Sequence, residues 1–412
     1  KKGEVKVKKI LFFTSARSDF GTIRLLIKEA KKHKVFEAFL LISGSHFLES
    51  KGYTYKEIEY ESLLPEVNTF KLSEFPDGVT PHVLCVGIGE TLVEISEFFS
   101  GNNFDGIVIC GDRYELFTIT VPALLHKIPV FHISGGEITE GVIDDNVRHA
   151  TTKLAHIHFV ANRIYARNVS LMGEEDWRIQ IVGECELDNI YNGGTSSKKE
   201  IMEKFSINLD NDVLLVTMHP STLDLIPFEN QIDNLLKALE KFTTNFQIVF
   251  TAPGNELGAD YFTRKIREFV EGHPNSKFVE HFGSRNYISV LKFAKVVIGN
   301  SSSGIVEAPS LGTPTINIGN RQRNRLSADS VIHVSYEIDE IVKALQLVLS
   351  SSFREKIRNV ENPYDPYKDG KGAERIVNTI INALELKKEK VLIKKFDNSL
   401  HEEEWNFLLR RG

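Results

Sequence analysis

Two stretches of this chain, Ile107-Val-Ile-Cys-Gly-Asp-Arg-Tyr-Glu115 and Pro129-Val-Phe-His-Ile-Ser-Gly-Gly-Glu137, share one pattern. Each begins with a short apolar run and continues with glycine and charged residues. Such runs are typical of strands that are buried on both faces of a parallel sheet. In open α/β sheets, ligands bind beyond the carboxyl ends of the strands. We therefore expect a ligand site where these charged residues gather.

A group of acids and bases lies just beyond these two runs. Its members are Asp112, Arg113, Glu137, Asp144, Asp145, Arg148 and His149. Several carboxyl and basic groups at one edge of a sheet are typical of a site for proton transfer. The alternative interpretation is that they cap helices and pair with one another. Because the group is large and includes the pair Gly135-Gly136, we favour proton chemistry.

Strand and helix patterns alternate along nearly the whole chain, which predicts an α/β fold with parallel sheets. In the first half we expect strands at 9–14, 39–42, 83–85, 107–110, 130–133, 158–160 and 179–182, with helices at 20–33, 94–99, 116–126 and 142–155. In the second half we expect strands at 213–216, 247–250, 277–279, 296–298 and 315–318, with helices at 232–242 and 261–270.

The domain boundaries follow from length and composition. A chain of 412 residues is too long for one ordinary core. A Gly/Ser/Asn stretch at 191–198 is a credible linker, with a hinge near residue 193. We predict an N-terminal Rossmann-like domain over 1–192 and a C-terminal Rossmann-like, nucleotide-binding domain over 199–371. In the last segment, 372–412, we expect a long amphipathic helix at 373–388 that packs back onto the first half.

The composition excludes several classes of protein. Hydrophobic residues make up 42% and charged residues 26%, and the net charge of −6 provides no basic surface for nucleic acid. No apolar run is long enough to span a bilayer, so we expect no membrane partner. The charged start at Lys1 does not resemble a signal peptide. The three scattered cysteines, Cys85, Cys110 and Cys185, favour a reducing cytoplasm and buried thiols, two of them in strands.

Common cofactor and metal motifs are missing from the sequence. Gly87-Ile-Gly89 begins a dinucleotide fingerprint, but Leu92 occupies the place of the third glycine. No phosphate-binding P-loop and no HExxH zinc motif occur. His156 and His158 flank one residue at a strand start, which is more typical of structural histidines than of metal ligands. We expect neither a cofactor nor a metal.

The second half contains a candidate anion site. Asn300-Ser-Ser-Ser-Gly304 follows a predicted strand and opens a predicted helix, so the backbone N–H groups near Ser301 and Ser302 suit a phosphate. The alternative is that one of these serines is only a helix cap. His219 stands at the equivalent end of its own strand. Arg321, with Arg323 and Arg325, adds positive charge after another strand.

Three further residues complete the candidate set. Arg17 and His46 follow the first two strands of the first half, at the same expected edge of the sheet. Glu307 lies near the predicted helix start, where it could favour the helix dipole or accept both hydroxyl groups of a ribose. Spacing alone leaves these two roles of Glu307 open.

Taken together, these motifs resemble the UDP-N-acetylglucosamine 2-epimerase family over residues 8 to 385, and most closely its hydrolysing branch, which serves sialic-acid and legionaminic-acid pathways. The resemblance rests on Thr14-Ser-Ala-Arg-Ser-Asp-Phe-Gly21, Gly111-Asp-Arg113, Gly135-Gly-Glu137, Ile143-Asp-Asp145, Arg148-His-Ala150, His219-Pro220, Gly299-Asn-Ser-Ser-Ser-Gly304, Gly312-Thr-Pro314, Asn317-Ile-Gly-Asn-Arg-Gln322 and Asn362-Pro-Tyr364.

The resemblance implies a GT-B-type fold: two doubly wound, Rossmann-like domains with the nucleotide sugar in the cleft between them. It implies conversion of UDP-GlcNAc and water into ManNAc and UDP through a 2-acetamidoglucal, without a nicotinamide cofactor. It suggests a homodimer or homotetramer. It marks Asp112, Glu137, Asp144 and His219 as catalytic, and it fits substrate or UDP contacts for Arg17, His46, Arg113, Ser301, Ser302, Glu307 and Arg321.

One departure from the family pattern bears on the chemistry. Some members carry a catalytic Glu where this chain has Ser134, so we expect Glu137, or Asp144 with Asp145, to take over that role. Which carboxylate acts as the base stays open. The alternatives are the same reaction on a 2,4-diacetamido-2,4,6-trideoxy sugar nucleotide, the non-hydrolysing epimerase reaction, and a regulatory protein that binds the nucleotide sugar without turnover.

Overall fold

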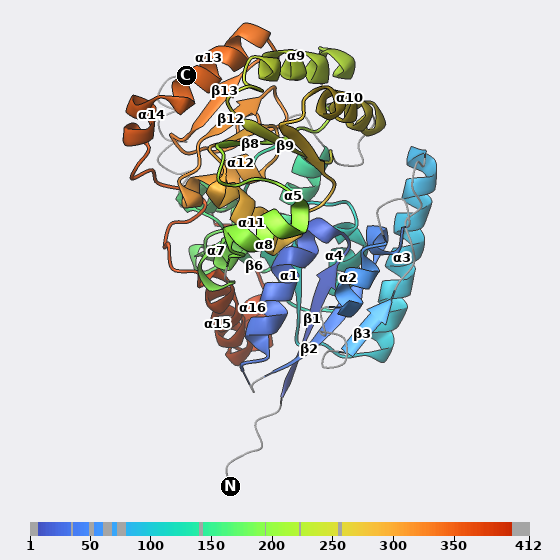
Figure 1. Ribbon diagram of the computed structural model, residues 1–412. Coiled ribbons are helices and arrows are strands. Elements are labelled where there is room, and N and C mark those ends of the chain that lie inside the picture. Colours follow the sequence, from blue (N-terminus) through green and yellow to red (C-terminus); the bar gives the residue numbers. More distant parts are fainter. Residues whose placement is uncertain are drawn as a thin grey trace, which may run out of the picture. The chain divides into compact units, whose positions relative to one another are not determined.

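The computed structural model describes residues 7–33, 36–48, 53–60, 68–71, 80–139, 143–193, 195–221, 224–253 and 258–397. The chain divides into two compact units (Figure 1). The first consists of Lys1–Ile138, Val142–Glu186 and Lys371–Gly412, and the second of Thr139–Gly141 and Leu187–Gly370. The short stretch from 187 to 192, which we predicted at the end of the first domain, therefore contacts mainly the second unit.

The first unit is built on a seven-stranded sheet in which every pairing is parallel. The strand order is β3-β2-β1-β4-β5-β6-β7. The strands are β1 Lys8–Thr14, β2 Phe36–Ile42, β3 Asn68–Lys71, β4 Gly106–Cys110, β5 Val130–Ile133, β6 Ile157–Val160 and β7 Ile179–Ile181.

The helices of the first unit lie mostly between consecutive strands. They are α1 Arg17–Ala30, η1 Gly44–Phe47, α2 Tyr55–Tyr60, α3 Pro81–Gly101, α4 Leu116–Leu125, α5 Ile143–Leu154, α6 Arg163–Leu171, η4 Asp176–Arg178 and η5 Cys185–Leu187, with α15 Gly372–Glu385 and α16 Lys388–Leu392 added from the end of the chain.

The second unit repeats the arrangement with a six-stranded parallel sheet of order β10-β9-β8-β11-β12-β13. Its strands are β8 Val213–Thr217, β9 Gln247–Thr251, β10 Ser276–Val279, β11 Val296–Gly299, β12 Thr315–Ile318 and β13 Val331–Val334. Its helices are α7 Asp188–Asn192, α8 Lys198–Phe205, α9 Phe228–Glu240, α10 Ala259–Gly272, α11 Ser284–Phe293, α12 Ser303–Val306, η6 Ala308–Leu311, α13 Ile338–Leu349 and α14 Ser351–Lys356.

Both sheets reverse their direction of winding after their third strand in the chain, and the next strand pairs with the other side of the first one. In the first unit the reversal lies between β1 and β4, and in the second between β8 and β11. At such a switch point the loops after the two central strands diverge to opposite faces of the sheet, which leaves a natural ligand position beyond their carboxyl ends. This topology confirms the prediction of two Rossmann-like α/β sheets.

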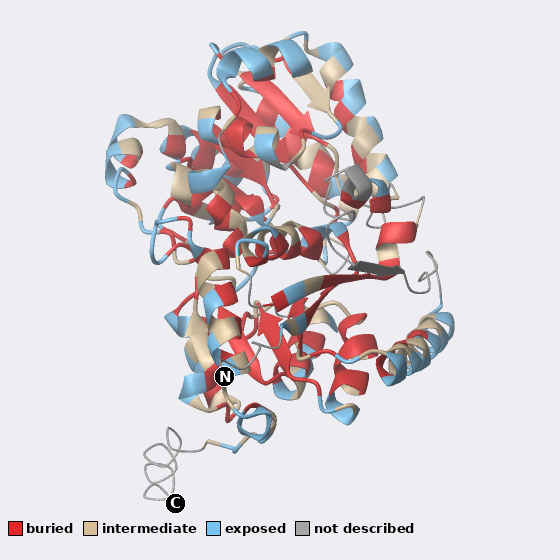
Figure 2. Cartoon of the chain, turned by 90° about the horizontal axis from the view of Figure 1, so that it is seen from below, coloured by how far each residue is buried: buried red, intermediate tan, exposed pale blue. Residues whose placement is uncertain are grey.

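The strands are buried on both faces, as the apolar runs predicted. Along β1, Ile10 and Phe12 belong to one core cluster, whereas Leu11 and Phe13 belong to the cluster on the other face. Figure 2 shows buried positions concentrated along the strands and exposed positions along the outer faces of the helices. The alternation of the β1 side chains between the two faces follows from the two-residue period of a strand.

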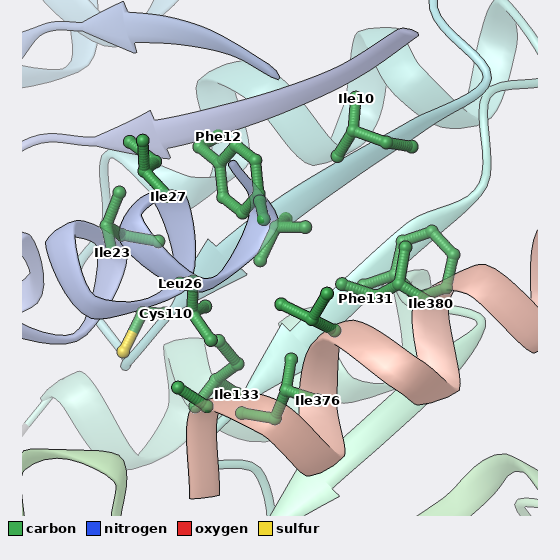
Figure 3. Close-up of a cluster of buried hydrophobic side chains, with 14 of the residues drawn as sticks. Ile10, Phe12, Ile23, Leu26, Ile27, Cys110, Phe131, Ile133, Ile376 and Ile380 are labelled. Carbon is green, nitrogen blue, oxygen red and sulfur yellow. The ribbon is translucent and has the colours of Figure 1, made fainter. Parts of the chain in front are cut away.

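The last long helix completes the core of the first unit. Ile376 and Ile380 of α15 lie in one apolar cluster with Ile23 and Ile27 of α1 and with Phe131 of β5 (Figure 3). A spacing of three or four residues places such side chains on one face of a helix. The end of the chain therefore covers the same face of the sheet as its first helix.

Buried charges fasten the segment that follows α15. Arg178 is only 1% exposed and donates hydrogen bonds to the carbonyl oxygens of Val391 at 2.7 Å and Ile393 at 2.8 Å. The ammonium group of Lys394 lies 2.7 Å from Oε2 of the buried Glu174. Because a buried charge is costly unless it is paired, these contacts fix α16 and the residues after it on the first unit.

The strand predicted at 83–85 is wrong, because these residues belong to α3. Thr80 caps this helix through a bond from Val83 N to Oγ1 of 3.4 Å, and Pro81 occupies its first turn, where the missing N–H costs nothing. Thr91, Ile95 and Phe99 are buried four residues apart, which is a helical repeat. The glycine pair at 87 and 89 is therefore helical and forms no nucleotide-binding turn.

The structure also corrects the expected place of one thiol and adds two strands. Cys85 lies exposed on α3 rather than in a strand, whereas Cys110 and Cys185 are buried. The sequence analysis missed β3 and β13, which are short strands at the edges of their sheets. In the part of the chain that the structure describes, no helix is both long and apolar enough to cross a membrane.

Gly299 at the end of β11 tests how closely the two central strands of the second unit approach. Its φ is +133°, and an added Cβ would overlap the carbonyl oxygen of Thr217 in β8. We predict that Gly299→Ala destabilises the protein by more than the ~1–3 kcal/mol of backbone strain alone, measured by chemical denaturation.

Gly312→Ala is the matched control for Gly299→Ala. Gly312 also has a positive φ, +69°, but a Cβ there would have no heavy atom of the described chain within 4 Å. This variant should therefore lose only the free energy of unfolding that a left-handed conformation costs an alanine, about 1–2 kcal/mol. Equal losses in the two variants would show that the contact with Thr217 has no energetic weight.

Candidate active site

The loop after β1 is held by a buried carboxylate. Asp19, in the first turn of α1, accepts hydrogen bonds from the hydroxyl groups of Thr14 and Ser15 and from the Ser15 N–H at 3.0 Å. Burial raises the pKa of Asp19 to about 6, although these bonds act in the opposite direction. The loop that carries Arg17, an exposed residue at the start of α1, is thereby fixed from below.

The structure changes the expected role of His46. This residue is fully buried, and its ring lies between Thr14 Oγ1 at 2.9 Å from Nε2 and Thr54 Oγ1 at 2.9 Å from Nδ1. Burial, aided by the positive charge of Arg113, lowers the pKa of His46 to about 4, so the ring is neutral near pH 7. With both nitrogens bonded inside the protein, His46 supports the loop after β1 instead of contacting a ligand.

The loop after β4 presents Arg113 in a fixed orientation. Its Nη2 lies 2.7 Å from Glu115 Oε1 and its Nε lies 3.2 Å from Oε2, which is a two-point ion pair. The Glu115 side chain is fully buried, whereas that of Arg113 is 36% exposed. Glu115 therefore anchors a guanidinium group that faces solvent at the carboxyl edge of the sheet.

Arg148 on α5 joins the carboxylates that the sequence had grouped together. Its Nη2 forms an ion pair with Asp112, and its Nη1 lies 3.3 Å from Asp145 Oδ1 and 3.0 Å from the carbonyl oxygen of Glu137. Arg148 is 3% exposed, whereas the carboxylates of Asp112 and Asp145 are 30% and 23% exposed. One buried cation thus links the loops after β4 and β5 to the first turn of α5.

Asp144 lies in the same turn of α5 but in a different electrostatic setting. Partial burial raises its pKa, and the negative charge of Asp112 adds to the rise, while Arg113 and Arg148 act against it. Asp144 has no hydrogen bond or ion pair with any residue in the described ranges of the chain. A carboxyl group in this setting exchanges protons closer to neutral pH than an exposed aspartate does.

Glu137 follows a tight turn at the end of β5. Ser134 and Gly136 both have positive φ angles, 65° and 75°, and the Gly136 carbonyl accepts a 2.8 Å hydrogen bond from Asn168. Glu137 itself is 3% exposed. The glycine pair in the sequence therefore marks a turn that brings Glu137 into the same group as Asp112 and Arg148, as predicted.

In the second unit, the loops after β8 and β11 are locked together by one side-chain amide. Asn300 Oδ1 accepts from the His219 N–H at 2.8 Å, and Asn300 Nδ2 donates to the His219 carbonyl oxygen at 2.8 Å. Asn300 is fully buried. These bonds use the backbone of His219, so they do not depend on its imidazole. The switch point between β8 and β11 thus carries His219, as the sequence predicted.

Asn300 also receives the segment after β12. Its carbonyl oxygen accepts hydrogen bonds from Arg321 Nη1 at 3.2 Å and from Gln322 Nε2 at 3.1 Å. Arg321 is exposed and Gln322 is buried. Arg325 bonds to Gln322 Oε1 at 3.2 Å and lies over the ring of the buried Tyr364. Of these cations, Arg321 is therefore the one that lies directly at the end of β11.

The three consecutive serines after Asn300 have different surroundings. Ser303 is buried and its hydroxyl group contacts Tyr287 at 2.6 Å and Ser301 at 3.1 Å. Ser302 is exposed, and its side chain caps nothing. The helix that they open, α12, is only four residues long. So short a helix has a weaker dipole than we predicted for anion binding. The serine hydroxyl groups nevertheless lie just after β11, as we expected.

The structure also corrects the position of Glu307. This residue is the C-cap of α12 and the N-cap of the four-residue η6, where its side chain forms no cap hydrogen bond. Its negative charge contributes to the raised pKa of the buried Tyr287, after the larger effect of burial. At the start of so short a helix the dipole role of Glu307 is small, and the contact with a ligand stays a prediction.

Sequence reasoning had assigned no role to three residues that organise these loops. The sequence could have indicated the role of Asp19, because Thr14 and Ser15 followed by an acid a few residues later resemble a capped helix start. No sequence spacing indicates the roles of Glu115 and Asn300. Their importance comes from partners, Arg113 and His219, that only the folded chain brings close.

The two units therefore carry different sets of functional groups. The first has several carboxylates around a buried arginine, which suits proton transfer and the stabilisation of positive charge. The second has hydroxyl, imidazole and guanidinium groups at its switch point, which suit an anion. Among the described residues, no three His, Cys, Asp or Glu side chains are placed to hold a metal ion.

Proteins that resemble this chain are consistent with these two sets of functional groups. The family model described as UDP-N-acetylglucosamine 2-epimerase matches residues 28–381. The polysialic acid biosynthesis protein P7 of Escherichia coli is 30% identical, over 95% of this chain and 96% of its own. The GDP/UDP-N,N'-diacetylbacillosamine 2-epimerase (hydrolyzing) of Campylobacter jejuni is 32% identical, over 84% of this chain and 89% of its own.

Solved structures show the same fold. The UDP-GlcNAc 2-epimerase from Neisseria meningitidis, bound to UDP-GlcNAc, aligns with a TM-score of 0.69 at 20% identity, over 91% of this chain and all of that one. The one from Rickettsia bellii aligns with a TM-score of 0.71 at 17% identity, over 92% and 97%. With a family match over most of its length and a relative 30% identical along nearly all of it, this chain belongs to the UDP-N-acetylglucosamine 2-epimerase family.

Proposed function

We propose that this protein is a hydrolysing UDP-GlcNAc 2-epimerase that converts UDP-GlcNAc and water into ManNAc and UDP. The observation that carries the proposal is the carboxylate group of the first unit, in which Asp112 is ion-paired with Arg148 while Asp144 has a raised pKa. A protein that only bound the nucleotide sugar would not need one ion-paired carboxylate beside another whose pKa is raised. Relatives whose printed names include "hydrolyzing" support the hydrolytic outcome.

The reaction proceeds in two balanced stages. In the first, a carboxylate takes the proton from C2, the C2–H electron pair becomes the C1=C2 double bond, and the C1–O pair leaves with UDP. In the second, the C1=C2 electron pair of the resulting 2-acetamidoglucal takes up a proton at C2, on the face opposite to the proton that was removed. The oxygen of water bonds to C1 and gives up a proton to a base. The C2 proton is weakly acidic, so charge on the departing diphosphate must be stabilised as it develops.

The residues of the two units suit these two demands. Asp112, Glu137 and Asp144 are proposed for the sugar, where they would exchange protons and stabilise positive charge at C1. His219, Ser301, Ser302 and Arg321 are proposed for the diphosphate, with Arg17 and Arg113 as further cationic contacts, and Glu307 for the ribose.

A second candidate keeps the reaction and changes the sugar. Two relatives, 32% and 29% identical, are named as diacetylbacillosamine 2-epimerases. Their names favour a 2,4-diacetamido-2,4,6-trideoxy sugar carried by UDP or GDP. The ratio of kcat/KM for the two nucleotide sugars decides between them.

The proton-transfer residues can be tested by isosteric substitution. Asp112→Asn and Glu137→Gln should keep UDP binding but lower turnover by roughly 10²-fold or more, because each removes a carboxylate proposed for proton transfer. Asp112 is ion-paired with Arg148, and the backbone carbonyl of Glu137 accepts a hydrogen bond from the same arginine. Turnover is followed by UDP release, and UDP affinity by calorimetric titration. Near-normal turnover in both variants would contradict the assignment.

Asp105→Asn is the matched control for the Asp112 variant. Asp105 precedes β4 at its amino end, where it pairs with Lys8 at 3.3 Å and accepts from the Lys9 N–H at 2.9 Å. It is a partly exposed aspartate that flanks the same strand as Asp112, but at the amino end of that strand instead of the carboxyl end. Its substitution should leave turnover unchanged, so a loss equal to that of Asp112→Asn would point to damage of the sheet.

Isotopic labelling tests the two stages of the reaction. Product formed in D₂O should carry deuterium at C2, since the proton there is exchanged with a carboxyl group. Product formed in H₂¹⁸O should carry the label at C1, since water supplies the new oxygen. Mass spectrometry and NMR of the sugar report both labels. A free sugar with protium at C2 would rule out the elimination route.

His219 tests the diphosphate contact. His219→Ala should weaken UDP binding by about 10- to 100-fold, because a hydrogen bond to a charged group contributes about 1.5–3 kcal/mol. The fold should survive, since Asn300 is held by the backbone of His219. His273→Ala, which removes a ring stacked on Phe269 at 4.2 Å, is the control and should lower only the melting temperature. Unchanged UDP affinity in folded His219→Ala would place the diphosphate elsewhere.

A further inference from the structure

Arg148 has an unusual position for a residue that the proposed reaction does not use directly. It is almost completely buried, yet it contacts three different segments at the carboxyl edge of the first sheet. These are the loop after β4 at Asp112, the loop after β5 at the carbonyl of Glu137, and its own helix at Asp145. A planar guanidinium group can hold several oxygen atoms in fixed directions, which a lysine cannot do.

Arg148 treats the two adjacent acids of α5 differently. Asp145, three residues before it, receives a bond from Nη1 at 3.3 Å. Asp144, one residue earlier, has no bonded partner within the described ranges. On a helix, residues three and four apart are both neighbours, so both acids are within reach of Arg148, and it is the bond to Asp145 that distinguishes them.

We propose that Arg148 is the positioning residue of the acid–base group: by holding Asp112 and Asp145 as bonded carboxylates, it leaves Asp144 as the carboxyl group that exchanges protons. This inference rests on the proposed function, because it assigns unequal roles to carboxylates of that site. Asp112 then provides a fixed negative charge, and Asp144 changes its protonation state during turnover.

The electrostatic setting of Asp144 supports this division. The charged or titratable groups around it are Asp112, Arg113 and Glu115 from the loop after β4, and Asp145, Arg148 and His149 from its own helix. Burial and then Asp112 raise the pKa of Asp144, whereas Arg148 lowers it. Removing Arg148 should therefore raise this pKa further, and removing the charge of Asp112 should lower it.

The first test is a titration that needs no substrate. Aspartate labelled with ¹³C at the carboxyl carbon is followed by NMR from pH 4 to 9, and Asp144→Asn identifies the Asp144 signal. Relative to the unchanged protein, its midpoint should move up in Arg148→Met, move down in Asp112→Asn, and stay close in Arg148→Lys, which keeps the charge. Shifts of the same sign in Arg148→Met and Asp112→Asn would overturn the proposal.

The second test separates charge from orientation by turnover. Arg148→Met should lower kcat by about 10²-fold, because a small displacement of the reacting groups can cost that much. The limb of the kcat–pH profile that Asp144 controls should move to higher pH in Arg148→Met and vanish in Asp144→Asn. Arg148→Lys should keep the position of the limb and recover only part of kcat.

Arg178 provides the matched structural control. Like Arg148 it is almost fully buried, pairs with an acid three residues earlier, at 2.7 Å, and donates to backbone carbonyls. Arg178→Lys should lower the melting temperature without moving the kcat–pH profile. If it moves the profile as Arg148→Met does, Arg148 has only a structural role. If Arg148→Met does not fold, the other two variants still test the proposal, because the Asp144 midpoint should stay in place in Arg148→Lys and move down in Asp112→Asn.

Absence of turnover with both nucleotide sugars would contradict the proposed function, and the NMR titration would still test Arg148. An unmoved Asp144 midpoint in Arg148→Met, in a protein that does turn over UDP-GlcNAc, would contradict the role of Arg148 alone. The two proposals can therefore fail separately.

Discussion

The parallel pairing of every strand is the constraint on which the rest of this structure depends. It forces all carboxyl ends of each sheet to one edge, so residues far apart in the sequence meet there. The strand order reverses between β1 and β4 in the first unit and between β8 and β11 in the second. The candidate residues Arg17, Asp112, His219 and Ser301 all follow one of these four strands. The site chemistry is thus a consequence of topology before it is a consequence of any single side chain.

The two switch points are organised by different means. In the first unit, buried charges fix the loops: Arg148 holds Asp112, and Glu115 holds Arg113. In the second unit, a neutral amide does so, because Asn300 bonds to both backbone groups of His219. A charged framework perturbs the protonation of its neighbours, whereas an amide framework leaves space for the charge of a ligand. This difference supports an acid–base role for the first unit and an anion-binding role for the second.

The sequence predicted the sheets well, because buried parallel strands leave short apolar runs that end in glycine or charge. It failed where the type of element depends on the surrounding residues, and where the role of a side chain depends on its partners in the folded chain. The run at 83–85 looked like a strand, but Pro81 and the buried spacing of Thr91, Ile95 and Phe99 make it part of a helix. His46 looked available to a ligand, yet Thr14 and Thr54 occupy both of its nitrogens. Spacing can place a residue at the edge of a sheet, but it cannot show which neighbour the fold supplies.

The central claim is that the carboxylates of the first unit and the anion-binding groups of the second catalyse one hydrolytic epimerisation. The most direct test is ³¹P and ¹H NMR of the purified protein incubated with UDP-GlcNAc, and in parallel with the UDP-linked 2,4-diacetamido-2,4,6-trideoxy sugar. The account predicts that free UDP and a free sugar inverted at C2 appear in equal amounts from at least one of the two. A product that stays attached to UDP, or no product from either substrate, would contradict it.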